Sequence, residues 1–263
     1  MQLLPATSGL GWLRDGFALW RRQPSELSLL FLLYVTLNLF VSVMAAPLGV
    51  IATLLLGQVF VTAFMLGCAE VDAGRNARPR MLFAYLRHPA LARLIGLGLC
   101  YLVAVFIAVG VTYLYAGGGL ADVVIKARNS GTGMVDEATS AAIVRAMFLG
   151  MSVYTILVLP LWFAGPLIAW QDMGVAKAIF FSVMSVLRAI KAFIALILAW
   201  TAIWLFVAVN VGVLLSLLPG GQIMQTILAL PCSIMLYLLG YCTFYPSYVE
   251  LFGKPTLPER NPD

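Results

Sequence analysis

Long apolar stretches alternate with short polar connections along the whole chain. Six stretches are long enough to cross ~30 Å of hydrocarbon as a helix, which takes about 20 residues. Lipid offers no hydrogen-bonding partner to a backbone amide, so each stretch must be helical. The pattern predicts an all-α polytopic membrane bundle in one domain, residues 1–263. Its six spans are expected at residues 27–46, 48–69, 94–115, 143–170, 190–218 and 224–248.

The connections between the spans differ in a regular way. Residues 44–49 and 218–222 are tight turns that contain proline and glycine, so the spans that they join should be antiparallel neighbours. We expect three hairpins, in units that cover residues 10–74, 79–174 and 175–253, followed by a tail at residues 254–263. The long outer connection, residues 116–142, has two interpretations: an insertion, or a lid or partner-binding loop.

A short amphipathic segment precedes each hairpin. In the first segment, Trp12, Phe17 and Trp20 fall on one face of a helix and the arginines lie off it. Such a helix lies in the cytoplasmic headgroup region with its aromatic side toward the lipid. The segments at residues 80–89 and 175–191 repeat the pattern. The basic residues expected to face anionic headgroups are Arg14, Arg21, Arg22, Arg80 and Arg87.

Charged residues are scarce and unevenly placed. Only 10% of residues are charged and 62% are hydrophobic, whereas about a quarter are charged in soluble domains, so this is an integral membrane protein. Thirteen of the sixteen lysines and arginines fall in the N-terminal segment, the second and fourth connections and the tail. This asymmetry predicts that both termini are cytoplasmic. The first apolar run has no cleavage pattern after it and should remain as a span.

Each even-numbered span ends with an acid shortly before a glycine, at Asp72, Asp172 and Glu250. A carboxylate at a helix C-terminus opposes the helix dipole by ~0.3–1 kcal/mol, so a compensating partner is expected. We expect these acids to form ion pairs with arginines of the surface helices at the cytoplasmic side. Asp172 has the alternative of capping the next helix. The other interpretation is that all three are solvated carboxylates at the membrane edge.

The spans hold few groups that could perform chemistry. No charged residue lies at the centre of a span, which disfavours an ion-coupled carrier with a carboxylate relay. The four cysteines have no close paired spacing, His88 is the only histidine, and motifs for zinc, a serine nucleophile or phosphate binding are absent. We therefore expect no enzyme activity, cofactor or metal. Nucleic acid is a poor partner, because the positive charge is dispersed along membrane boundaries.

The polar groups within the spans are the candidates for binding a ligand. Asn38, Gln58 and Asn210 carry amides, and Tyr237 and Tyr241 share one face of the last span. The alternatives are interhelical hydrogen bonds for the asparagines and a packed seam for the tyrosines. Two prolines in the fourth span predict a kink, and broken helices can form transporter sites.

Several short motifs are spread over nearly the whole chain. They include Gly11-Trp12-Leu13-Arg14-Asp15-Gly16-Phe17, Gly165-Pro166-Leu167 and Tyr245-Pro246-Ser247-Tyr248. These motifs resemble those of a family of multi-pass inner-membrane proteins of proteobacteria that carries no established chemistry. The resemblance implies location in the inner membrane and a six-span topology.

The function expected from these observations is that of a non-enzymatic membrane protein. It would bind lipid, another envelope protein or a second copy of itself, as a scaffold or accessory subunit. The alternative is a transporter or flippase-like protein that moves a lipid or other amphiphile through a groove near Asn38, Asn210 and Tyr241. An intramembrane enzyme is a remote third class, because no catalytic constellation is present.

Overall fold

The computed structural model describes residues 4–44, 48–115, 137–216 and 221–257, and all regular structure in these ranges is helical. In chain order the elements are α1 (Ala6–Arg22), α2 (Pro24–Met44), α3 (Gly49–Asp72), η1 (Pro79–Arg87), α4 (Leu91–Tyr115), α6 (Glu137–Val158), η2 (Leu159–Leu161), α7 (Ala164–Trp170), α8 (Val175–Arg188), α9 (Ile190–Ser216) and α10 (Gly221–Phe252). Most of the expected outer loop, residues 116–136, lies outside the described residues, and its remainder belongs to α6.

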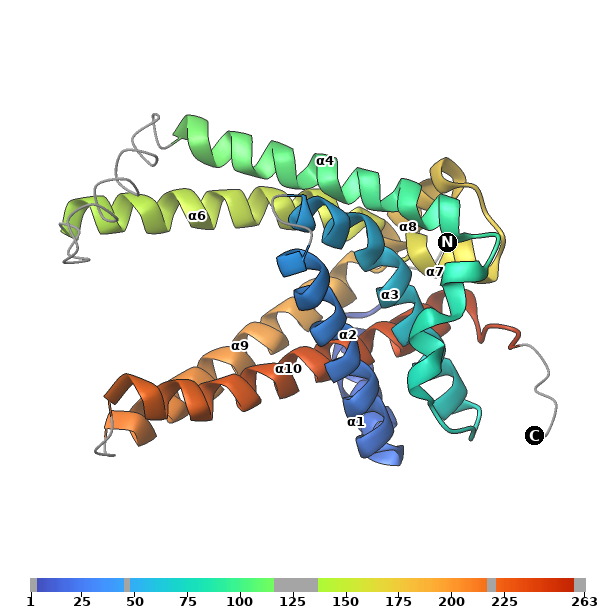
Figure 1. Cartoon of the computed structure of the whole chain (residues 1–263), viewed down its shortest axis with the longest axis horizontal. Helices are drawn as coiled ribbons and strands as arrows, with labels where there is room; N and C mark the ends of the chain where they lie inside the picture. Colours follow the sequence, from blue (N-terminus) through green and yellow to red (C-terminus); the bar gives the residue numbers. More distant parts are fainter. Residues whose placement is uncertain (1–3, 45–47, 116–136, 217–220, 258–263) are drawn as a thin grey trace.

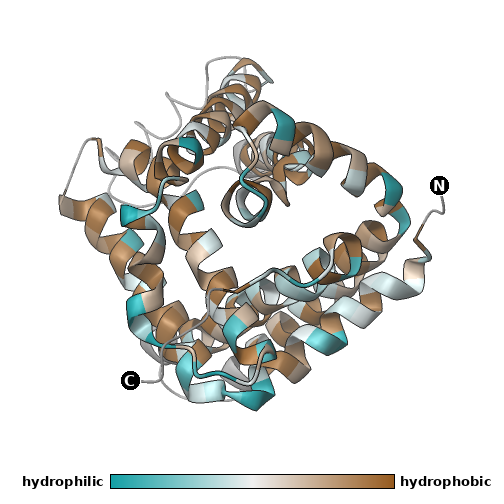
Figure 2. Cartoon of the chain, turned by 90° about the vertical axis from the view of Figure 1, so that its right-hand side faces the viewer, coloured by the Kyte–Doolittle hydropathy of each residue, from teal (hydrophilic) through white to brown (hydrophobic). Residues whose placement is uncertain are grey.

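Six segments are long and apolar enough to cross a membrane. They are Pro24–Met44, Gly49–Asp72, Leu91–Tyr115, Ile143–Trp170, Ile190–Val213 and Ala229–Phe252. Each overlaps one of the six apolar stretches of the sequence, so the prediction of an all-helical protein with six spans is confirmed. Figure 2 agrees with this assignment, because hydrophobic residues dominate the long helices and hydrophilic ones gather on the loops and short helices.

Two long arms give the molecule its shape (Figure 1). One arm consists of α4 and α6, which lie side by side, and the other consists of α9 and α10. Both arms start at the end of the molecule that holds α8 and the last turn of α10, and they diverge away from it. We call this end the base, and we include α1 and η1 in it because both contact span ends there. The helices α2 and α3 pack on each other, and α3 contacts both α4 and α10, so it joins the two arms.

The first helix packs on the last two spans. A Cβ on Gly9 would overlap the carbonyl oxygen of Ala192 in α9, and a Cβ on Gly16 would lie 2.8 Å from the backbone of Thr243 in α10. Between these glycines, Trp12 is only 1% exposed and its ring meets Phe193 edge to face at 5.3 Å. The expectation that Trp12 faces lipid is therefore wrong. The two glycines let α1 approach so closely that this aromatic side chain becomes part of the protein core.

The two other short helices also pack on spans that precede them. η1 lies against α3 and α2, and α8 lies against η2 and α7. Tyr85 of η1 accepts a hydrogen bond from the indole of Trp170 at 2.9 Å, and burial raises the pKa of its phenol above the ordinary value. Ser182 of α8 accepts a hydrogen bond from the backbone of Phe163 at 3.0 Å. Each short helix thus ties neighbouring spans together at the base.

The fourth span is broken, as its prolines predict. The α-helix ends at Val158, a 3-10 turn contains Pro160, and a separate helix, α7, holds Pro166. Each proline removes a backbone donor, which ends the regular ladder. A Cβ on Gly165 would lie 2.7 Å from the hydroxyl of Thr62, so α7 lies close against α3.

Candidate functional site: a cavity among the spans

A cavity of about 890 Å³ lies between the helices, and it is not enclosed on all sides. Ligand pockets typically measure ~300–1,000 Å³, so this volume suits a ligand rather than a few waters. Side chains from α2, α3, α4, α6, α9 and α10 and from the broken part of the fourth span line it. All six spans therefore contribute to one site.

Ten of the 29 described residues that line the cavity are aromatic. They come from five of the six spans, all but α3, as Tyr34, Tyr101, Tyr154, Trp162, Phe193, Trp200, Trp204, Tyr237, Tyr241 and Phe244. No Asp, Glu, Lys, Arg or His is among the lining residues that the structure describes. An uncharged aromatic wall favours apolar and neutral groups, since an isolated charge is costly to bury.

Most hydroxyls of the wall are already satisfied. Thr53, Thr62 and Thr201 each donate to the carbonyl four residues earlier in their own helix, at 2.8, 2.7 and 2.9 Å. The hydroxyls of Tyr34 and Tyr241 share one hydrogen bond of 3.0 Å. A shared bond uses one of the two O–H protons, so the pair keeps one donor for another acceptor.

Gln58 differs from these threonines. Its side-chain amide lines the cavity and has no hydrogen-bond partner among the described residues. The side-chain amide of Gln58 is not fully buried, so a molecule in the cavity can reach it. An amide in this position requires water or a ligand to satisfy it.

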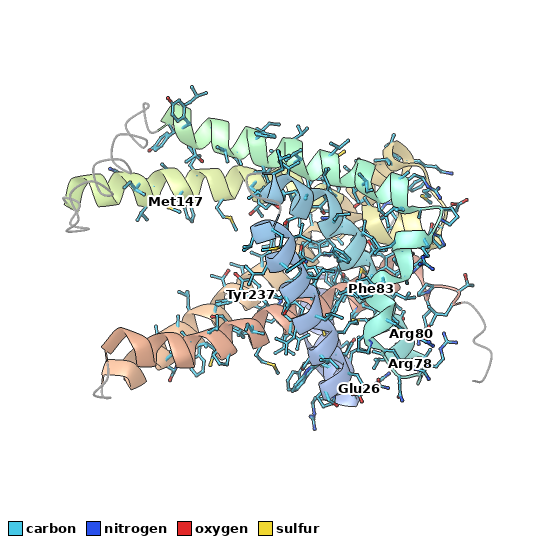
Figure 3. The ribbon with its side chains drawn as sticks, in the orientation of Figure 1. Glu26, Arg78, Arg80, Phe83, Met147 and Tyr237 are labelled. Carbon is cyan, nitrogen blue, oxygen red and sulfur yellow. The ribbon has the colours of Figure 1, made fainter. Side chains whose placement is uncertain are left out.

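Four of the five predicted ligand-binding residues line the cavity, namely Asn38, Gln58, Tyr237 and Tyr241. The amide of Asn38 also donates to the carbonyl of Tyr34 at 2.8 Å, within the same helix. Tyr241 packs among the rings of Phe31, Tyr34 and Phe64, and so belongs to both a packed seam and the cavity wall. Tyr237 is 57% exposed and contacts the Trp204 ring edge to face at 5.2 Å. Figure 3 shows Tyr237 on the α9 and α10 arm.

Asn210 lies outside the cavity. It is exposed, and its amide donates to the carbonyl of Phe206 at 2.7 Å in its own helix. The cavity face of α9 includes Thr201, Leu205 and Ala208. Two residues correspond to a turn of about 200° around a helix, so Asn210 points away from the face that holds Ala208. The expectation of a groove that includes Asn210 is therefore wrong.

The sequence did not single out the tryptophans of the cavity. Trp162 follows the 3-10 turn of the fourth span, and its indole N–H is buried without a hydrogen-bond partner among the described atoms. Trp200 and Trp204 lie four residues apart on α9 and both line the cavity. Their spacing is a weak signal, because four-residue spacing of aromatics is equally typical of ordinary helix packing.

The three acids at the ends of the even-numbered spans have different partners. The Asp72 carboxylate forms ion pairs with Arg22 and Lys254, with N–O distances of 3.1 and 2.7 Å. It also accepts a hydrogen bond from the hydroxyl of Tyr245 at 3.2 Å. Glu250 accepts the hydroxyl of Ser8 at 2.8 Å and the indole N–H of Trp12. Asp72 thus pairs with an arginine of α1, whereas Glu250 bonds neutral groups of the same helix.

Asp172 pairs with Arg93, at the start of α4, and not with a surface helix. The same guanidinium donates to the backbone carbonyls of Asp172 at 3.0 Å and Met173 at 3.2 Å. The residue before α8 is Gly174, and no side chain caps this helix, so the expectation that Asp172 caps it is wrong. Asp172 itself has a φ of 49°, in the left-handed region, which turns its side chain toward α4.

The arginines expected to face headgroups lie at the base, and Figure 3 labels Arg80 beside Arg78 and Phe83. Arg14 pairs with its neighbour Asp15, and Arg21 lies over the Phe17 ring at 5.9 Å. Arg80 and Arg87 are exposed and form no ion pair within the part of the chain that the structure describes. In the same part, no group of three His, Cys, Asp or Glu side chains is placed to hold a metal.

Six apolar helices around an uncharged cavity, with basic residues at one end, define an integral, multi-pass membrane protein. No family model and no solved structure matches the chain. Over 273 aligned positions the chain is 32% identical to a probable inner membrane protein of Burkholderia thailandensis, and the alignment covers 99% of both chains. The chain belongs to the same family as this protein and is an integral inner membrane protein, as its motifs predict.

Proposed function

We propose that this protein is a non-enzymatic, lipid-binding component of the inner membrane that holds the apolar part of a lipid or other amphiphile in its central cavity. The observation that carries the proposal is the uncharged, aromatic wall of a cavity of about 890 Å³ that all six spans contribute to. Lipid chains are the most abundant apolar molecules around such a site. In this role the protein would serve as a scaffold or an accessory subunit for an envelope protein or for a second copy of itself.

The arrangement that we propose in the membrane is three hairpins whose short helices lie at the cytoplasmic surface. The exposed faces of the short helices support this arrangement, because Phe83 of η1 and Phe180 and Leu187 of α8 expose 43%, 61% and 57% of their surface beside basic residues. Apolar side chains beside arginine suit the boundary between acyl chains and anionic headgroups. With the base on this side, both termini are cytoplasmic.

The alternative is that the protein moves its amphiphile across the membrane, as a transporter or flippase does. The broken fourth span supports this alternative, because irregular backbone at mid-membrane is common where transporters bind their substrates. A fluorescent lipid in proteoliposomes tests it: movement between leaflets above that of protein-free vesicles favours transport. An enzymatic role has no comparable support.

Filling the cavity tests the main proposal. Gly57 lines the cavity, and a Cβ at this position meets nothing within 4 Å. Gly57→Trp should fill part of the cavity and lower the amount of lipid that remains bound in native mass spectrometry of the purified protein. Gly110 also has open space around it and does not line the cavity, so Gly110→Trp is the matched control. Equal lipid retention in both variants would contradict the proposal.

A further inference from the structure

The chemistry of the cavity wall selects among lipids by the charge of the head group. A phosphate or a carboxylate inside the cavity would meet no lysine, arginine or histidine among the lining residues that the structure describes. Burying a charge without a partner is strongly unfavourable. A lipid that enters head first must therefore have an uncharged head, whereas a charged lipid could insert only its chains.

The wall offers free hydrogen-bonding groups to such a head. The threonines use their protons within their own helices, but the Gln58 amide has no hydrogen-bond partner among the described residues, and the pair of Tyr34 and Tyr241 keeps one O–H. The hydroxyl of Tyr154, in the wall from α6, likewise has no hydrogen-bond partner among the described residues. Together these groups supply both donors and acceptors, which matches a hydroxyl or an ester better than a pure hydrocarbon.

Packed aromatic rings separate the cavity from the last turn of α10. Phe193 and Phe244 belong to its wall, and Phe163 packs behind both rings at 5.9 and 6.0 Å. Phe163 in turn contacts Phe252, the last residue of α10, at 5.5 Å. This aromatic layer lies between the cavity and the last turn of α10.

The cavity also reaches the gap between the two arms. Figure 1 shows that the arm of α4 and α6 diverges from the arm of α9 and α10, and α6 and α9 do not pack on each other over the described residues. The cavity wall nevertheless includes Thr155 from α6 and Leu205 and Ala208 from α9. Thr155 and Leu205 are both exposed, so the cavity is open between these two helices.

We propose that the cavity takes a lipid with an uncharged, hydrogen-bonding head, such as a diacylglycerol, which enters sideways between α6 and α9 and is held by Gln58 and the pair of Tyr34 and Tyr241. This inference rests on the proposed function, since it names the class of lipid that the same cavity binds. The observations behind it are the absence of charge in the described wall, the unsatisfied amide and the aromatic layer at the base.

Photolabelling of the full-length protein in nanodiscs tests this inference. The probes are a diacylglycerol with a diazirine in one chain and a phosphatidylglycerol with the same chains. We expect the diacylglycerol to label the cavity residues about fivefold more than the phosphatidylglycerol, the factor that one hydrogen bond of ordinary strength supplies. Gln58→Leu should remove most of this preference, while the acyl chains of both lipids still bind in the cavity.

Two results separate the inference from the proposed function. Equal labelling by both probes, unchanged in Gln58→Leu but lost in Gly57→Trp, would overturn the neutral-head inference and leave lipid binding intact. Labelling that Gly57→Trp does not reduce would overturn both. Gly110→Trp shows whether a new tryptophan in a span disturbs labelling by itself. A double variant, Tyr34→Phe with Tyr241→Phe, should lower the preference for diacylglycerol. It should leave the packing of the helices unchanged, since both rings remain.

Discussion

Gly16 of α1 lies so close to Thr243 of α10 that a Cβ on the glycine would come within 2.8 Å of the backbone nitrogen of the threonine. Real Cβ atoms do not approach backbone atoms this closely, so only glycine fits without displacing a helix. The contact joins the beginning of the chain to its last span. The first helix thereby holds the arm of α9 and α10 at the base.

Gly16→Ala should therefore weaken the protein, because the new methyl group pushes α1 away from α10. Overpacking of this kind typically costs about 1–3 kcal/mol. The control is Gly11→Ala, on the same helix, where a Cβ meets nothing within 4 Å and alanine favours the helix by ~0.5–1 kcal/mol. Thermal unfolding in detergent should show opposite shifts for the two variants. A shift of the same sign and size would show that α1 does not pack in this way.

Asp72 joins three parts of the chain through its carboxylate, which is 18% exposed. Its ion pairs reach Arg22 at the end of α1 and Lys254 after α10. Asp72→Asn should lower the free energy of unfolding by about 1–2 kcal/mol, since both partners lose their counter-charge. Asp15→Asn removes the pair with Arg14, whose side chain is 82% exposed, and should change stability little. Chemical denaturation of both variants measures the difference.

We expect Arg93 to contribute more to stability than its acidic partner, Asp172. Its guanidinium bonds the carboxylate of Asp172 and also two backbone carbonyls, whereas that carboxylate is 87% exposed. Arg93→Gln should therefore cost about 1–2 kcal/mol and Asp172→Asn less than ~1 kcal/mol. Asparagine is the correct replacement, because Asp172 has a φ of 49° and alanine would add strain there. Equal effects of the two substitutions would mean that the carbonyl contacts contribute nothing.

The pattern of apolar residues was sufficient to locate the six spans and the break in the fourth. It did not show which face of each span points inward, because a helix that is apolar all round carries no such information. This is why Asn210, a polar residue in the right kind of span, was wrongly assigned to the groove, while Trp162 and Trp200 were overlooked. Trp12 was placed toward lipid for a related reason. Its burial depends on contacts with α9 and α10, which lie far away in the sequence.

The proposed orientation, with both termini cytoplasmic, rests on the distribution of charges and can be tested directly. If the base is cytoplasmic, a cysteine at Arg80 is accessible from the cytoplasm and one at Leu114, at the far end of α4, from the periplasm. Both side chains are exposed, so a thiol at either position can react once water reaches it. A background in which the four native cysteines are replaced removes other reactive thiols.

An impermeant maleimide added to intact cells should label Leu114→Cys at once, and it should label Arg80→Cys only after the membrane is opened. The background without cysteines gives the unspecific signal, and a permeant maleimide shows that both sites react when they are reached. The reverse pattern would place the base in the periplasm. The arginines of η1 would then face away from the leaflet that the positive-inside rule assigns to them, and the proposed contact of the short helices with cytoplasmic headgroups would be wrong.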